Sequence, residues 1–158
     1  MPKSKGPRKK RPAGRKLNPS THMQVPGIFR MDPDRSWLLK LGPHARLDYI
    51  QEGSGTPMDL QIVTARINLA YVLVTRHFSD PEATASALSG LDVLRDVHAR
   101  GADVPKLAAA EEFLLLAEAL CLMDEIQDRT SRMEQASALE FVHENCDIPV
   151  EALNQLSV

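Results

Sequence analysis

The stretch TPMDLQIVTARINLAYVLVTRHF, residues 56–78, decides the fold of this chain, because it predicts one long and largely buried helix. Thr56 before Pro57, with Asp59 three residues on, is a typical helix start. The apolar residues that follow cover nearly the whole circumference of a helix, as at the centre of a bundle. They are Met58, Leu60, Ile62, Val63, Ile67, Leu69, Ala70, Val72, Leu73 and Val74. Their β-branched members leave a strand over Ile67–Val74 as an alternative.

Helix starts of the same kind recur downstream of this stretch. The predicted helices run from Asp80 to Gly101, from Pro105 to about Gln127, from Ser131 to about Asn145, and from Pro149 to Leu156. Ser131 with Glu134 forms a capping box, in which each side chain accepts from the backbone N–H of the other residue. Upstream, Pro43 suits the first position of a short helix and Gly53 its left-handed cap. For residues 28–41 we expect a short segment that is irregular or helical.

Short links join the predicted helices, and the sequence has neither an alternating strand pattern nor an internal repeat. Links of roughly two to five residues imply antiparallel neighbours. We therefore predict an all-α fold, a compact bundle of three long and one or two short helices, over residues 28–158. The helices predicted from Pro57 and Pro105 are very apolar. A homodimer in which they pack across the interface is therefore an alternative to a monomer.

Residues 1–27 differ in composition from the rest of the chain. Five prolines lie among basic residues, glycines and serines: Pro2, Pro7, Pro12, Pro19 and Pro26. Almost no residue here can enter an apolar core, so the segment cannot offset its ordering entropy. We predict a flexible, disordered or extended basic N-terminal arm over residues 1–27.

Charge is divided sharply between this arm and the rest of the chain. Residues 1–16 contain no acid and eight basic residues, which are Lys3, Lys5, Arg8, Lys9, Lys10, Arg11, Arg15 and Lys16. The chain has 19 Lys and Arg against 21 Asp and Glu, so residues 17–158 carry a net charge of −10. Because clustered positive charges bind phosphates by releasing counterions, we expect the eight to bind nucleic acid nonspecifically. A solubilising tail, or one that contacts anionic lipid or an acidic protein, is the alternative.

A stripe of acidic residues marks the helix predicted from Pro105. Glu111, Glu118 and Glu125 recur every seven residues and therefore lie along one side. A solvated helix face is the ordinary explanation of such a stripe. The sharper hypothesis is a docking surface for a basic protein partner or for the chain's own arm.

No pattern in the sequence indicates catalysis. Glu140 and His143 match the Glu-x-x-His spacing of di-metal carboxylate bundles, but such sites need a second copy and two more inward glutamates. The sequence has no P-loop, dinucleotide-binding glycine pattern or nucleophile elbow. We predict a protein that is not an enzyme, with no catalytic residue, no metal site and no cofactor.

Cys121 and Cys146 lie in different predicted helices without CxxC spacing, so we expect buried free thiols. The sequence contains no apolar run of transmembrane length and no signal peptide, which favours a cytoplasmic protein of a bacterium or phage-infected cell without a membrane partner. Arg66 stands out in the apolar run of residues 56–78. We expect it beside a carboxylate of a packed helix, or at a rim position from which its head group reaches water.

Several short motifs carry a resemblance to a class of known proteins. These are Pro2-Lys3-Ser4-Lys5, Pro7-Arg8-Lys9-Lys10, Gly53-Ser54-Gly55-Thr56 and Arg66-Ile67-Asn68-Leu69-Ala70. With them, the arm and the first third of the body resemble small, mostly uncharacterised accessory proteins of phages and prophages. The resemblance implies a phage or mobile-element origin and an accessory or regulatory role, and it assigns no functional residue.

Two functional hypotheses follow from the residues and the resemblance together. The first is a non-enzymatic accessory protein whose helical body makes protein contacts while its arm binds nucleic acid. The alternative is a helical interaction or inhibitor protein that acts on a host factor through its acidic body, with an incidental arm.

Overall fold

The computed structural model describes residues 33–101 and 103–156, and this part of the chain contains helices and no strand. The helices are α1 (Pro33–Glu52), α2 (Pro57–His77), α3 (Pro81–Ala99), α4 (Ala110–Arg129), α5 (Arg132–Asn145) and α6 (Val150–Asn154). The predicted all-α bundle is confirmed. The predicted arm over residues 1–27, with its eight basic side chains, lies outside the described residues.

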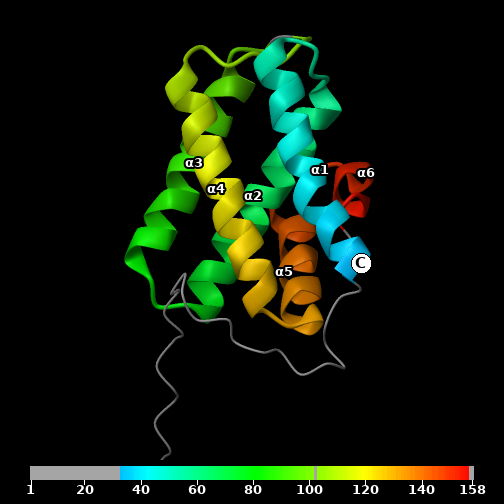
Figure 1. Cartoon of the computed structure of the whole chain (residues 1–158), viewed down its shortest axis with the longest axis vertical. Coiled ribbons are helices and arrows are strands. Elements are labelled where there is room, and N and C mark those ends of the chain that lie inside the picture. The colour runs from blue at the N-terminus through cyan, green and yellow to red at the C-terminus, as the bar shows by residue number, and fades with distance from the viewer. Residues whose placement is uncertain (1–32, 102, 157–158) are drawn as a thin grey trace, which may run out of the picture.

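Helix α2 is the centre of the bundle, as its sequence predicts. It contacts each of the other five helices, and Figure 1 shows the long helices gathered around it. Its start is a capping box: the Thr56 hydroxyl accepts from the Asp59 N–H at 3.2 Å, and the Asp59 carboxylate accepts from the Thr56 N–H at 2.8 Å. Apolar residues on nearly every side of α2 are buried, which matches the predicted apolar circumference.

Two apolar clusters share α2 and α4. The α1–α3 cluster joins them to α1 and α3, and its members include Leu47, Ile50, Val63, Ile67, Leu94, Leu116 and Leu120. The α5–α6 cluster joins them to α5 and α6, and its members include Leu69, Leu73, Met123, Ile126, Val142, Ala152 and Leu153. Because α2 contributes to both clusters, neither half of the core can form without it.

Helices α2, α3 and α4 approach closely at Gly90. A Cβ atom at this position would lie 2.8 Å from the Ala119 Cβ and 3.3 Å from the Ile67 Cγ2. Such distances are shorter than ordinary van der Waals contact, so only glycine fits here without a shift. This explains a glycine in the interior of α3, where it costs helix propensity.

The first helix is longer than the sequence predicts. Pro43 lies inside α1 and not at the first position of a short helix. A proline there removes one helical hydrogen bond, yet Pro43 is buried in line with Leu39 and Leu47. Packing of this apolar stripe against α2 maintains the helix on both sides of the proline.

The fourth helix begins later than predicted, at Ala110 and not at Pro105. Arg100 holds the preceding loop in place, because its guanidinium donates to the Lys106 carbonyl oxygen at 3.2 Å and binds the Glu112 carboxylate. The same carboxylate accepts from the Ala108 N–H at 2.6 Å. Glu112 thus satisfies a backbone donor at a helix start that has no side-chain cap at Ala109.

Both cysteines are free thiols, but the prediction that they are buried is wrong. Cys121 is exposed on α4 and Cys146 is half-buried after α5. The desolvation that they do experience raises the pKa of both thiols. Within the described residues, no helix combines the length and the apolar character needed to cross a membrane.

Candidate functional site

Arg66 is the most unusual residue in the core, a guanidinium only 2% exposed on the central helix. Its Nη2 donates to the Asp124 Oδ1 at 3.0 Å and to the Gln127 Oε1 at 2.5 Å, so the predicted carboxylate partner is confirmed and the rim position is wrong. Burial lowers the pKa of Arg66, and its hydrogen bond and charge interaction with Asp124 counteract this by stabilising the charged form.

The carboxylate of Asp124 extends this polar contact to α1. Its second oxygen, Oδ2, lies 2.9 Å from the His44 Nε2. One turn further along α4, Asp128 accepts from the Lys40 Nζ at 2.7 Å. The two aspartates therefore fix α1 on one side of α4 and Arg66 of α2 beside it.

Gln135 of α5 continues the polar contacts on the other side of Gln127. Its Nε2 donates to the Gln127 carbonyl oxygen at 3.1 Å and to the Thr130 Oγ1 at 3.1 Å. The start of α5 is itself fixed by the predicted capping box of Ser131 and Glu134. These contacts position α5 across the side of α2 on which Arg66 lies.

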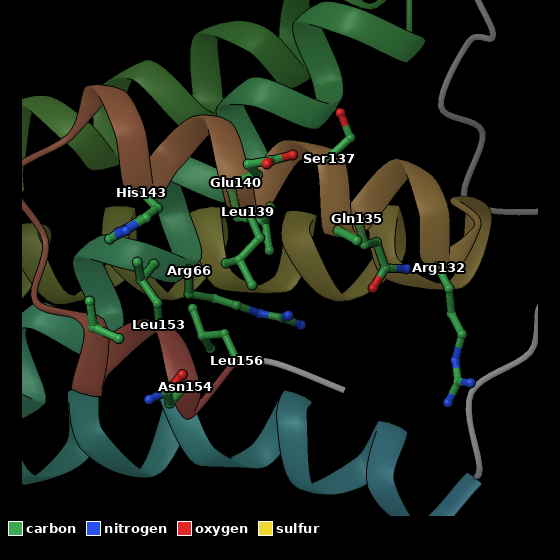
Figure 2. A pocket seen from close by; sticks show the side chains of 13 residues that line it. Arg66, Arg132, Gln135, Ser137, Leu139, Glu140, His143, Leu153, Asn154 and Leu156 are labelled. Atoms are coloured by element: carbon green, nitrogen blue, oxygen red, sulfur yellow. The ribbon is translucent and has the colours of Figure 1, made fainter.

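A cavity of about 660 Å³ lies between α2, α5 and α6 (Figure 2). Its apolar lining comes from all three helices and the residues that follow α6: Leu69, Ala136, Leu139, Val150, Leu153 and Leu156. Its polar lining consists of Arg66, Arg132, Gln135, Ser137, Glu140, His143 and Asn154. We take this cavity as the candidate functional site of the described chain, since large apolar pockets with a few polar groups are the usual form of ligand sites.

The cavity has a cationic end and an apolar end. The Arg66 guanidinium points toward the end where Gln135 and Arg132 lie, whereas Leu153 lies toward the other end (Figure 2). The Glu140 carboxylate points away from Arg66. Positive charge is therefore concentrated near the first turn of α5.

The Nε atom of Arg66 is a buried donor without an acceptor among the described residues. Both hydrogen bonds that the guanidinium donates to described residues leave from Nη2. Buried polar groups of this kind are rare in folded proteins, and each costs free energy unless a water or ligand satisfies it.

The acidic stripe predicted on the fourth helix is accessible only in part. Glu111 and Glu118 are exposed, with Leu114 between them 64% exposed on the same helix face. Glu125 instead forms an ion pair with Arg129 at 3.0 Å. The stripe thus presents two exposed glutamates around an exposed leucine, while its third member forms an ion pair within the chain.

The Glu-x-x-His motif lies beside the cavity. Glu140 and His143 both line it, and Phe141 between them lies under the Arg76 guanidinium, 4.3 Å from the ring centroid. In the described part of the chain, no three His, Cys, Asp or Glu side chains gather closely enough to hold a metal ion. Glu140 and His143 contribute to the lining of the cavity on its α5 side.

The cavity itself is the feature that sequence reasoning missed. Arg66 was conspicuous as a polar residue in an apolar run, but its neighbours across the cavity come from α5 and α6, far along the chain. No spacing in the sequence connects these segments.

We find no match to the chain among protein-family models, curated proteins or solved structures. The resemblance to phage accessory proteins stays a prediction.

Proposed function

We propose that the chain is a non-enzymatic accessory protein of a phage or mobile element that acts in the cytoplasm. Its helical body makes protein contacts, and the basic residues between Lys3 and Lys16 bind nucleic acid nonspecifically. The observation that carries this proposal is the charge division, eight positive charges in residues 1–16 against a net −10 in the remainder. Such a division directs phosphates to one segment of the molecule.

Ion pairs within the body support this division of labour. Six of its basic side chains bind carboxylates of the same chain: Lys40, Arg46, Arg66, Arg95, Arg100 and Arg129. Their charge is already compensated, while Glu111 and Glu118 are exposed. Phosphates therefore gain little from the body, and binding falls to the arm.

Exposed apolar side chains near the start of α1 support the protein contacts. Trp37 is 63% exposed, and Leu38 and Leu41 are also exposed. Several large apolar side chains exposed close together indicate a surface that binds another protein.

The test compares the full chain with a deletion of residues 1–16 on a duplex DNA and on a duplex RNA across a salt series. For the full chain, the log–log slope of affinity against salt should be about −3 to −5, and it would approach about −7 if all eight charges engaged. The deletion should lose most of the affinity and of the slope.

A matched body variant controls for general loss of charge. Lys106→Gln with Arg95→Gln removes two exposed positive charges from the body and should leave the slope unchanged. Equal affinity of the full chain and the deletion, or binding insensitive to salt, would contradict the proposal.

A second candidate function rests on the surface of α4. Glu111, Leu114 and Glu118 follow one another at helical spacing on one exposed face, and an exposed leucine between carboxylates suits a basic, partly apolar protein partner. This favours the alternative of an interaction or inhibitor protein. A host protein that binds the full chain and the 1–16 deletion equally, but not a Leu114→Ser variant, would support it.

A further inference from the structure

The unsatisfied Arg66 Nε carries an inference that does not depend on the proposed function. The side chain of Arg66 contributes to the wall of the cavity between α2, α5 and α6, and its buried Nε–H finds no acceptor among the described residues. An acceptor that reaches this nitrogen from the cavity would restore the missing hydrogen bond. A charged acceptor would gain more, because hydrogen bonds between ionised groups are about twice as strong as neutral ones.

The charges around the cavity favour one negative charge in the occupant. Asp124 compensates the positive charge of Arg66. Arg132, exposed at the same end of the cavity, takes part in none of the ion pairs between described residues and adds a second positive charge. The nearest carboxylate in the lining, Glu140, points away from Arg66. A single anionic head group is therefore favoured at this end.

The remainder of the cavity requires an apolar body. Leucines from three segments line it: Leu69, Leu139, Leu153 and Leu156. Its volume of about 660 Å³ lies within the range of sites that enclose small organic molecules, roughly 300–1,000 Å³. The occupant is thus a molecule with one charged end and a flexible apolar chain.

We propose that this cavity is a binding site for an amphipathic carboxylate of medium chain length. The carboxylate lies at the end of the cavity where it accepts from the Arg66 Nε–H and is attracted by the charge of Arg132, and the hydrocarbon chain lies along the leucines toward α6. A carboxylate suits this end because an ionised acceptor forms a stronger hydrogen bond with a guanidinium N–H than a neutral acceptor does.

The experiment uses the full chain, labelled with ¹⁵N-arginine, and sodium decanoate kept below its micelle-forming concentration. The Arg66 Nε–H signal, protected by burial, should shift during the titration and saturate. Decanoate should bind about tenfold more tightly than decanol or decyltrimethylammonium, because only the carboxylate can form the charged hydrogen bond. Acetate, which lacks the apolar chain, should not shift the signal.

Two surface variants test the place of binding without altering Arg66. Ala136 and Arg132 are exposed residues of the cavity lining, so both substitutions should leave the fold intact. Ala136→Trp fills the cavity and should abolish binding. Arg132→Gln should weaken decanoate binding severalfold and leave decanol binding unchanged, whereas Arg95→Gln on exposed α3 should change neither.

The same variants distinguish decanoate binding in the cavity from decanoate binding to the basic N-terminal arm. All three variants retain residues 1–16, so decanoate attracted only by that arm would bind Ala136→Trp as well as the parent chain. That outcome would overturn the proposal, as would an Arg66 signal that does not move at millimolar decanoate. Equal affinity for the three decyl compounds would likewise overturn it.

Discussion

Arg66 of α2 and Asp124 of α4 form an ion pair of 3.0 Å in which the guanidinium is almost fully buried. The carboxylate also contacts His44 of α1, so one side chain joins three helices. Removing water from a charge inside a protein costs several kcal/mol, and a close partner is what makes the buried form tolerable. The stability of this junction therefore depends on the pair remaining complete.

Asp124→Ala should lower the free energy of unfolding by about 3 kcal/mol, because it leaves a buried guanidinium without its counter-charge. The double variant Arg66→Met, Asp124→Ala should recover much of this loss, since no buried charge then remains. Urea denaturation of the parent, the two single variants and the double variant gives the coupling energy directly.

The exposed pair of Arg95 and Asp92 serves as the matched control. Asp92→Ala should cost less than about 1 kcal/mol, because water screens the pair. If Asp124→Ala lowered the free energy of unfolding no more than Asp92→Ala, burial would not explain the contribution of the Arg66 pair to stability.

Gly90→Ala should destabilise the chain by about 1–3 kcal/mol, since the new Cβ would overlap Ala119 and force α3 away from α4. Ser89→Ala, one position earlier in α3, is the control, because it removes a hydroxyl without adding an atom and improves helix propensity. Thermal unfolding should therefore shift in opposite directions for the two variants. Ala119→Gly should partly rescue Gly90→Ala, and its failure to do so would remove the steric explanation.

The ion pair between Arg100 and Glu112 should make stability depend on pH in the acid range. The hydrogen bond from Arg100 is the main cause that holds the pKa of Glu112 below its usual value of 4.5. Because the pKa is lower in the folded chain, this contribution is complete above the unfolded value and is lost as the pH falls through the folded one. The stability difference between the parent and Glu112→Gln should shrink between pH 6 and pH 3. A difference that stays constant over this range would contradict the assignment.

Cys121 should react slowly with iodoacetamide although it is exposed. Desolvation, followed by the charges of Asp124 and Glu118, raises the pKa of its thiol, so less thiolate is present at neutral pH. In a Cys146→Ser background, the alkylation rate should reach its half-maximum at a higher pH in the folded chain than in urea. Glu118→Gln should move that midpoint downward, and an unchanged midpoint would exclude an effect of the Glu118 charge.

Helix starts were predicted well wherever a side chain caps the backbone. Thr56 and Ser131 form capping boxes, and Asp80 caps α3. These contacts join residues at most three apart, so they can be predicted from the local sequence alone. The left-handed glycines Gly53 and Gly101 were predictable for the same reason.

Errors arose where tertiary contacts outweigh local preference. Pro43 is normally read as a helix start, but the apolar stripe of α1 packs on α2 and continues the helix through it. Pro105 resembles a start as well, yet Arg100 and Glu112 fix the loop that follows. The cavity could not be predicted at all, because it depends on how α5 and α6 meet Arg66 across long sequence separations.

The sharing of α2 between the two apolar clusters has a consequence for synthesis on the ribosome. Helix α2 leaves the exit tunnel early, but the side that faces α5 and α6 stays uncovered until residues as late as Leu153 and Leu156 have been added. The nascent chain thus presents a long, nearly all-apolar segment during most of its elongation, a state that favours aggregation or chaperone binding. The core of this bundle can accordingly be completed only after its shortest helix has left the ribosome.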